Sequence, residues 1–459
     1  MYQIDFHTPV HVHFIGIGGI SMSGLAEILL KEGFTVSGSD SRESELTRHL
    51  EAAGASIHYG QCAENITAGI DVVVYTAAIH PDNPEYAAAV QAGIPLLARA
   101  ELLGQIMRNY RHAIAVSGTH GKTTTTSMLS LILLEAGKDP TISVGGILHE
   151  IGGNIRIGHS DTFLTEACEY TNSFLSFYPT LGIILNIEED HMDFFKDLAD
   201  IRNSFHRFSL LLPRHGLLVM NGEIPHPEEI TEGVQARVVT YGLTGQEDYS
   251  AGEISYDEKG CASFLAMQGK EALGTVRLSV PGMHNVSNAL AAIAASLEVG
   301  VPFDAICRGL RLFHGADRRF QYKGEVEGIT VIDDYAHHPT EIAATLKAAA
   351  NYPHRELWCV FQPHTYTRTQ AFLHEFAEAL SLADHVVLAD IYAAREVNTL
   401  GISSADLQKE MEKSGKSCSY FPTFEEIEAF LLKNCMHGDL LITMGAGDVH
   451  KIGENLLSR

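Results

Sequence analysis

The sequence predicts an α/β protein of three domains, each built on a mostly parallel, doubly wound sheet. Three observations support this prediction. The chain has 459 residues, more than one hydrophobic core normally supports. Short apolar runs alternate with helix-length segments over the first hundred or so residues and again over residues 329–459. Between these two regions, an apolar run passes through a glycine turn into a long helix.

The first region predicts three parallel strands connected by helices. The clearest helix, Ser21–Lys31, follows directly after the first strand and its turn. Ligands bind such sheets at the carboxyl ends of the strands. The predicted strands with their turns are His11–Gly19, Phe34–Asp40 and Asp71–Ala78.

The middle region contains a strand, a glycine turn and a helix at His112–Gly118, Thr119–Thr126 and Ser127–Gly137. The turn reads GTHGKTT and lacks the first glycine of the longer phosphate-loop pattern, since Val116 stands there. Its glycines let backbone N–H groups converge on a phosphate at the helix N-terminus, the lysine reaches the β- and γ-phosphates, and the threonine hydroxyl coordinates Mg²⁺. The stretch therefore predicts a nucleoside triphosphate site.

Acidic and polar residues follow two further apolar runs, Asp161–Phe174 and Leu181–Phe195. Because parallel strands end at one edge of a sheet, we expect these residues beside the phosphate loop. Either stretch alone is equally well explained as a solvated acidic loop, but two of them beside a triphosphate favour Mg²⁺ ligands. The residues are Glu166, Glu169, Asn186, Glu188, Asp190, His191 and Asp193.

The glycine-rich turn Gly16–Gly24, with Asp40 at the end of the next strand, resembles a dinucleotide fingerprint. Its third glycine is replaced by Ser21, so the nicotinamide interpretation is weak. A different nucleotide with its diphosphate on the same helix N-terminus fits the same physics. The chain would then hold two nucleotides, one as substrate and one as energy source.

The rest of the chain carries fewer signals. Residues 217–280 predict antiparallel strands, and residues 314–324 predict a domain boundary whose arginines, Arg318 and Arg319, either solvate a hinge or face nucleotide phosphates. The adjacent His337 and His338 are a weak metal signal, because they have no cysteine and no further histidine at helical spacing beside them.

Composition narrows the class of protein. A formal net charge of −25 argues against a nucleic acid or an anionic membrane as partner. The seven cysteines are scattered without a CxxC pair, which argues against a disulfide framework and a cysteine zinc site. The N-terminus lacks a signal-peptide pattern and no run of eighteen apolar residues occurs, so we expect a cytoplasmic enzyme.

Seven motifs in order resemble the Mur ligase family of bacterial cell-wall synthesis, and the resemblance covers essentially the whole chain. They are GIGGISMSG with GSD, SGTHGKTTTT, NIEEDHMD, HNVSNALAA, GADRRFQ, DDYAHHPTE and FQPHTYTRT. The resemblance implies an N-terminal UDP-sugar domain (1–110), a central ATP-binding domain (111–319) and a C-terminal domain (320–459) that closes over the site and binds an amino acid.

The resemblance also implies a reaction. ATP phosphorylates the lactyl carboxylate of UDP-N-acetylmuramate, and the amine of L-alanine displaces phosphate from the acyl phosphate. The expected cofactors are ATP and one or two Mg²⁺ ions. The expected partners are the small-molecule substrates, with no nucleic acid and no membrane insertion, and the expected assembly is a monomer or homodimer.

Site residues follow by matching motif to motif. One stretch departs from a common family form, since EACEYT stands where many relatives read EADESD, and this leaves the role of Glu169 open. The resemblance implies a UDP-sugar site at Gly16, Gly18, Gly19, Ser21, Ser39 and Asp40, ATP contacts at Gly118, Thr119, His120, Gly121, Lys122, Thr123, Thr124, Asn285, Arg318 and Asp334, metal ligands at Thr123, Glu166 and His191, and catalytic roles for Lys122, Thr123, His337 and Arg368.

Three alternatives remain at this point. One is a related ligase that attaches a recycled murein tripeptide to the same nucleotide sugar, although the segment FQPHTYTRT around Arg368 favours the single amino acid. Another is an NAD(P)-dependent oxidoreductase built on the Gly16–Asp40 region. The third is a phosphate-loop binding or switch protein with no chemistry.

Overall fold

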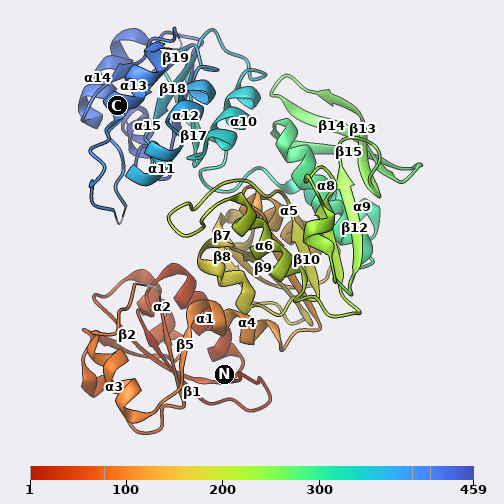
Figure 1. The fold of residues 1–459 in the computed structure, drawn as a ribbon, viewed down its shortest axis with the longest axis vertical. Coiled ribbons are helices and arrows are strands. Elements are labelled where there is room, and N and C mark those ends of the chain that lie inside the picture. Colours follow the sequence, from red (N-terminus) through yellow and green to blue (C-terminus); the bar gives the residue numbers. More distant parts are fainter. Residues whose placement is uncertain (1, 77, 395, 414, 459) are drawn as a thin grey trace.

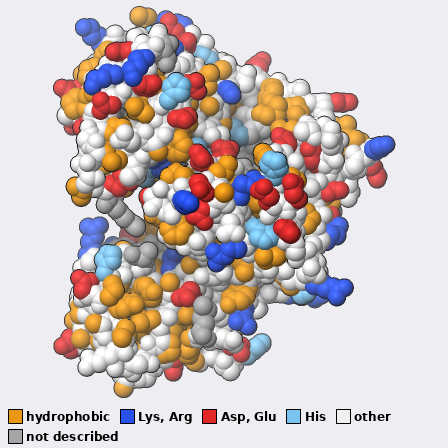
Figure 2. All heavy atoms as spheres, in the orientation of Figure 1, with side chains coloured by type: hydrophobic (Ala, Val, Ile, Leu, Met, Phe, Trp, Pro, Cys, Tyr) orange, Lys and Arg blue, Asp and Glu red, His pale blue; other side chains and the backbone are white. Residues whose placement is uncertain are grey.

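The computed structural model describes residues 2–76, 78–394, 396–413 and 415–458, and its elements form three α/β units (Figure 1). Their sheets have five, ten and six strands. This confirms the predicted fold class of three mostly parallel sheets, while the exact domain boundaries stay a prediction. The surface is hollowed between the N-terminal and C-terminal units on the left of the view in Figure 2. Among the described residues, no helix combines the length and apolarity needed to cross a bilayer.

The N-terminal sheet has the strand order β3-β2-β1-β4-β5, and all of its pairs are parallel. The order reverses at β1, so the turn after β1 opens onto a ligand crevice. The elements are β1 His11–Ile15, α1 Ile20–Lys31, β2 Thr35–Asp40, α2 Glu45–Ala52, β3 Ser56–Tyr59, β4 Val72–Tyr75, α3 Pro84–Ala92, β5 Leu96–Ala98 and α4 Arg99–Met107.

The central sheet has the order β15-β14-β13-β12-β11-β10-β6-β9-β7-β8. Strand β6 lies between β9 and β10 and runs parallel to both, so the three carboxyl ends meet at one edge. The elements are β6 His112–Ser117, α5 Lys122–Glu135, β7 Thr141–Leu148, β8 Gly153–Arg156, β9 Thr162–Ala167, a 3-10 segment Tyr170–Ser176, β10 Leu181–Ile184, α6 Leu198–Ser209, β11 Leu217–Asn221, α7 Glu228–Thr231, β12 Arg237–Gly242, β13 Tyr249–Tyr256, β14 Cys261–Gln268, β15 Glu271–Pro281, α8 Met283–Glu298 and α9 Phe303–Leu312.

The prediction of antiparallel strands over residues 217–280 is wrong in its first half. Strands β11 and β12 extend the sheet in parallel from β10, and only β13, β14 and β15 pair antiparallel to one another. The crossover between β11 and β12 carries α7, a helix of four residues. Such a short helix leaves almost no 3.6-residue periodicity in the sequence, so the crossover resembles a hairpin loop.

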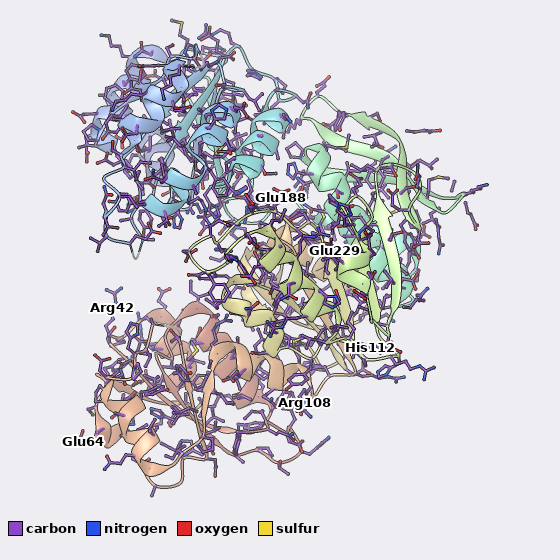
Figure 3. The ribbon with its side chains drawn as sticks, viewed as in Figure 1. Arg42, Glu64, Arg108, His112, Glu188 and Glu229 are labelled. Carbon is purple, nitrogen blue, oxygen red and sulfur yellow. The ribbon has the colours of Figure 1, made fainter. Side chains whose placement is uncertain are left out.

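The C-terminal sheet has the order β16-β17-β21-β18-β19-β20, with β16 antiparallel to β17 and the other pairs parallel. Helix α10 faces the central unit, and Glu188 lies at the junction between the two (Figure 3). The elements are β16 Gln321–Val326, β17 Ile329–Asp334, α10 Pro339–Ala349, β18 Leu357–Phe361, α11 Tyr366–Ala371, α12 Leu373–Leu380, β19 His385–Leu388, α13 Ser404–Lys413, β20 Ser419–Tyr420, α14 Phe424–Asn434, β21 Leu440–Met444 and α15 His450–Leu457.

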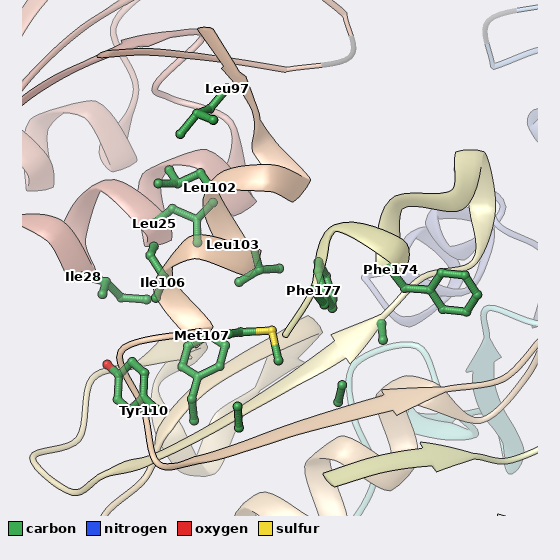
Figure 4. Packing of buried hydrophobic residues seen from close by; sticks show 14 of the residues in the cluster. Leu25, Ile28, Leu97, Leu102, Leu103, Ile106, Met107, Tyr110, Phe174 and Phe177 are labelled. Atoms are coloured by element: carbon green, nitrogen blue, oxygen red, sulfur yellow. The ribbon is translucent and has the colours of Figure 1, made fainter. Parts of the chain in front are cut away.

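One hydrophobic core continues from the N-terminal unit into the central unit. Helix α4 carries it, since Leu103 and Met107 belong to the same buried cluster as Phe177 of the central unit (Figure 4). The backbone approach is close, because a Cβ at Gly104 would collide with the carbonyl oxygen of Ser176. The C-terminal unit buries its apolar residues in clusters of its own.

Candidate active site

The glycine turn between β6 and α5 has a shape that only glycine adopts easily. Gly118 has φ +143°, and a Cβ there would lie 2.9 Å from Cβ of Leu185. Gly121 has φ +84° and precedes the first residue of α5. Both conformations lie in the region that side chains disfavour, so the turn keeps its backbone N–H groups at the N-terminus of α5.

The loop after β10 holds this turn in place through hydrogen bonds. The backbone N–H of His120 donates to Oδ1 of Asn186 at 2.7 Å, and Nδ2 of Asn186 returns a bond to the carbonyl oxygen of His120 at 3.1 Å. The N–H of Glu188 donates to the Thr119 hydroxyl at 2.9 Å. These reciprocal bonds hold the turn in one conformation without using the N–H groups of its helix end.

Lys122 is largely buried, and its ammonium contacts three acceptor groups. Its Nζ donates to the carbonyl oxygens of Gly118 and Thr119 at 2.5 and 3.0 Å and pairs with Oε2 of Glu169 at 3.0 Å. Burial by itself would lower the pKa of Lys122, but the Glu169 carboxylate raises it above its usual range. The charged ammonium is therefore fixed at the mouth of the turn, and Glu169, whose role the sequence leaves open, is its partner.

Two of the three predicted metal ligands lie together. Oγ1 of Thr123 donates to Oε2 of Glu166 at 3.1 Å, and Oε1 of Glu166 accepts from the N–H of Gly145 at 2.5 Å. Burial raises the pKa of Glu166. His191 lies on the other side of Glu169, with its Nε2 3.8 Å from Oε1 of that residue. Thr123, Glu166 and His191 as a joint ligand set stay a prediction.

A cavity of about 290 Å³ opens beside the turn and is walled by both the central and the C-terminal unit. Asn285 and Asn288 line it from α8, one helical turn apart, and the side chain of Asn288 donates to Oδ1 of Asn285 at 3.2 Å. Asp334 lines it from the end of β17, and burial raises the pKa of this carboxyl to about 6. Predicted ATP contacts that line this cavity are His120, Gly121, Thr124, Asn285 and Asp334.

Arg318, a predicted phosphate contact, is engaged inside the C-terminal unit. Its guanidinium donates to Oδ2 of Asp333 at 2.9 Å and to the carbonyl oxygens of Gly445 and Gly447 at 2.6 and 2.9 Å. The neighbouring Arg319 lines the cavity instead, with its Nη1 3.6 Å from Oε1 of Glu341. A nucleotide contact by Arg318 stays a prediction.

A second cavity, of about 240 Å³, includes His191 and Arg368 in its lining. Nη2 of Arg368 donates to Oδ1 of Asp190 at 2.7 Å across the junction of the two units. Burial by itself would raise the pKa of Asp190, but the Arg368 guanidinium holds it well below its usual range. His337 is near this pair, and burial lowers its pKa to about 3, so its imidazole is neutral at physiological pH.

The glycine turn of the N-terminal unit is bound to the end of β2. Gly16 has φ +84° and donates to the carbonyl oxygen of Ser39 at 2.9 Å. The N–H of Gly18 donates to Oδ2 of Asp40 at 2.8 Å. Gly19 directly precedes α1, and Ser21 is exposed in its first turn.

Ser39 faces inward. Its side chain is fully buried and donates to Oε2 of the equally buried Glu85 at 2.5 Å. A ligand in the crevice would therefore contact the backbone of Ser39. The Ser39 hydroxyl is engaged by Glu85 in the interior of the unit. The six residues predicted for the UDP-sugar lie in this one region, and their ligand contacts stay a prediction.

Glu341 is the principal site residue that the sequence did not single out. Its largely buried carboxylate lies 3.2 Å from Nδ1 of His120, 3.4 Å from Nδ1 of His337 and 3.6 Å from Nη1 of Arg319. Burial by itself would raise the pKa of Glu341, but His337 and His120 lower it well below its usual value. Its place in the first turn of α10, four residues after His337, was the available signal.

Three family models match the chain in succession. They are described as "Mur ligase family, catalytic domain" over residues 11–111, "Mur ligase middle domain" over residues 116–296 and "Mur ligase, glutamate ligase domain" over residues 318–447. The chain belongs to the Mur ligase family. Within it, the chain is 63% identical over 459 residues to the UDP-N-acetylmuramate–L-alanine ligase of Agathobacter rectalis and 59% identical over 458 residues to that of Lachnospira eligens, with full coverage of both chains in each case.

Solved structures of the family agree with this assignment. The UDP-N-acetylmuramate-alanine ligase of Thermotoga maritima superposes with a TM-score of 0.79 at 29% identity, covering 98% of this Mur ligase and 99% of that chain. A murein peptide ligase of Psychrobacter arcticus gives a TM-score of 0.68 at 27% identity, covering 98% of each.

Proposed function

We propose that this Mur ligase is an ATP-dependent ligase that joins L-alanine to the lactyl carboxylate of UDP-N-acetylmuramate. The observation that carries the proposal is identity of 50–63% over 97–100% of the chain to relatives that are all named UDP-N-acetylmuramate–L-alanine ligase. The phosphate-loop turn and the nucleotide-sized cavity beside it supply the chemistry that such a ligase needs. We further propose that it acts on these small molecules in the cytoplasm, as a monomer or homodimer.

The phosphoryl-transfer step uses the charged groups around the glycine turn. Transfer to a carboxylate requires positioning and charge neutralisation more than covalent help. The Lys122 ammonium lies within reach of a γ-phosphate at the N-terminus of α5 and would exchange its Glu169 contact for phosphate oxygens. The backbone N–H groups that the turn leaves free would bind the β-phosphate.

Magnesium fits the donor set on the same edge of the sheet. The hydroxyl of Thr123 and the carboxylate of Glu166 offer oxygen ligands 3.1 Å apart, and His191 lies 3.8 Å from the neighbouring Glu169. These residues would hold Mg²⁺, which neutralises phosphate charge when bound. The Glu166 carboxylate, with its raised pKa, is a group that a cation would stabilise in its charged form.

The amide-forming step requires that water be excluded, because an acyl phosphate hydrolyses readily. The C-terminal unit supplies one wall of both cavities, and Arg368 reaches from it to Asp190 of the central unit. Its closure would therefore seal the site. His337, with a pKa of about 3, is too weak a base in this state to deprotonate the amine, so we assign it to positioning the amino acid.

Phosphate release from ATP, screened across nucleotide sugars and amino acids, tests the proposal. We expect release only when UDP-N-acetylmuramate and L-alanine are both present, and we expect Lys122→Ala to abolish nearly all of it. Release that is independent of the amino acid, or unchanged activity in Lys122→Ala, would contradict the proposal.

Two alternatives can be separated, one in the same assay and one by calorimetry. Turnover with a murein tripeptide in place of L-alanine would support the recycling ligase, which the structural likeness to a murein peptide ligase keeps in view. Membership of the Mur ligase family argues against the oxidoreductase, and calorimetry with NAD(P)H should detect no binding.

A further inference from the structure

We infer that this Mur ligase has a site for a transition-metal ion of the zinc class, separate from the magnesium site, formed by His120, Glu188 and His338. Among the described residues, these three offer one ligand atom each, and the three atoms lie within 4.8 Å of one another. Two imidazoles and one carboxylate are a donor set that zinc prefers and magnesium does not.

Both imidazoles are oriented by a second partner, as metal-ligating histidines usually are. Nδ1 of His120 lies 3.2 Å from the Glu341 carboxylate, which would hold a proton on Nδ1 while Nε2, on the side of Glu188, gives up its proton to bind the ion. Nε2 of His338 donates to the carbonyl oxygen of Glu189 at 3.0 Å, so here the lone pair is on Nδ1, where an ion would replace the long N-cap bond of 3.4 Å from the N–H of Thr340. The two rings lie close together, with centroids 4.7 Å apart.

One ligand atom lacks a hydrogen-bond partner. Nε2 of His120 is buried, and among the described residues no hydrogen bond satisfies it, although Oε2 of Glu188 lies 3.5 Å away. A buried ring nitrogen without a partner is costly, and a bound cation would satisfy it. The carboxylates of Glu188 and Glu341 also give this position negative charge that a divalent cation neutralises.

The third ligand is positioned as well. Oε2 of Glu188 accepts a hydrogen bond from the Thr340 hydroxyl at 2.7 Å, which turns the carboxylate toward α10. His120 and Glu188 also line the cavity beside the glycine turn. The fourth coordination position of a tetrahedral ion would therefore be open to water or to a nucleotide phosphate from that cavity.

The three ligands come from two different units of the chain. His120 belongs to the phosphate-binding turn and Glu188 to the loop after β10, whereas His338 is the N-cap residue of α10 in the C-terminal unit. An ion at this site would bridge the two units and favour their closed arrangement.

The test is a titration of the full chain with Co²⁺, a coloured stand-in for zinc, in the presence of millimolar Mg²⁺ and without nucleotide. We expect one equivalent to bind with the intense visible absorption of tetrahedral cobalt, and Zn²⁺ to displace it. Because no substrate or turnover is involved, the result does not depend on the proposed reaction.

Variants identify the ligands. His338→Asn removes the imidazole but leaves a favourable N-cap for α10, and Glu188→Gln keeps an acceptor for Thr340. We expect each to weaken the affinity for Co²⁺ at least tenfold. Glu341→Gln removes the carboxylate that orients His120, together with its contacts to His337 and Arg319, and should weaken the affinity about 10- to 100-fold. His226→Asn is the matched control, since His226 is exposed and paired with Glu228, and its affinity should equal that of the unmodified chain.

Two results would overturn the inference. One is an affinity for Co²⁺ that His338→Asn and Glu188→Gln leave unchanged in well-folded protein, as judged by thermal melting. The other is a weak, octahedral spectrum that disappears as Mg²⁺ is raised, which would place the ion at the predicted magnesium ligands.

Discussion

The two junctions of this Mur ligase differ in chemistry. The junction between the N-terminal and central units is apolar, with Leu103, Met107 and Phe177 in one buried cluster and Gly104 against the backbone of Ser176. The junction between the central and C-terminal units is polar. It is made of contacts such as Arg368 with Asp190, Thr340 with Glu188 and His120 with Glu341.

This difference indicates which unit moves. Separating the apolar junction would expose a continuous core to water, at a cost of about 25 cal/mol for each Å² of apolar surface. Separating the polar junction exchanges ion pairs and hydrogen bonds for hydration, and the net change is small. We therefore expect the N-terminal and central units to behave as one body and the C-terminal unit to open and close over the site.

The largest expected effect comes from crowding the apolar junction. Gly104→Ala places a methyl group on the Ser176 carbonyl, and overpacking of this kind costs about 1–3 kcal/mol or more. We expect thermal melting to fall by about 5–10 °C. Gly153→Ala is the control, because a Cβ at Gly153 meets open space, and its melting temperature should stay close to that of the unmodified chain. Equal melting of the two variants would mean that α4 does not hold the units together.

Breaking the polar junction should affect catalysis more than stability. Asp190→Asn removes the charge that Arg368 contacts, and a charged hydrogen bond is worth about 1.5–3 kcal/mol. If this contact holds the closed state, kcat/KM for the amino acid should fall about tenfold to a hundredfold. Glu229→Gln disrupts an arginine pair inside the central unit and should leave steady-state kinetics unchanged. If Asp190→Asn lowers the melting temperature strongly and leaves the kinetics unchanged, the polar junction contributes to stability and not to closure of the site.

The pH dependence of the polar junction has a defined sign. Burial raises the pKa of Asp334 to about 6, above its unfolded value, so the protonated form is favoured in the folded chain. The contribution of the protonated Asp334 carboxyl to the free energy of unfolding is fully present at pH 4 and below and is lost as pH rises through 6. Between pH 5 and pH 7 it should decrease by about 1 kcal/mol. Asp334→Asn should lack this decrease, which is measured by comparing urea unfolding of the two proteins at both pH values. Parallel pH dependences would show that Asp334 titrates normally.

The smallest expected effect on stability comes from removing a surface ion pair. Arg308 and Glu135 form an ion pair on the surface of the central unit, away from both junctions, with Arg308 59% exposed. Such pairs contribute about 0–1 kcal/mol, so Arg308→Ala should change the melting temperature by no more than about 1–3 °C. A larger change would mean that surface pairs here are worth as much as the junction contacts.

Several features of this Mur ligase were predictable from local sequence. The turn GTHGKTT between an apolar strand and a helix places Lys122 and Thr123 at the N-terminus of α5, because the glycines and the helix end act within a few residues of one another. The adjacency of the acidic strand ends followed from parallel pairing alone, and β9 and β10 do flank β6. The direction of β12 did not follow, because α7 is too short to leave a periodic signal.

Other features were decided only by the tertiary structure, because they depend on how separate units pack. The residues alone did not separate Arg318 from Arg319, and the resemblance implied Arg318 as the ATP contact. The backbone at Arg318, with φ +59°, instead directs its side chain to Gly445 and Gly447 and leaves Arg319 at the cavity. His338 looked like half of a weak histidine pair, whereas its partners, His120 and Glu188, come from two loops of the central unit. Short-range backbone geometry is encoded in consecutive residues, but side-chain meetings across a junction depend on many distant contacts together, and no single stretch of sequence carries that information.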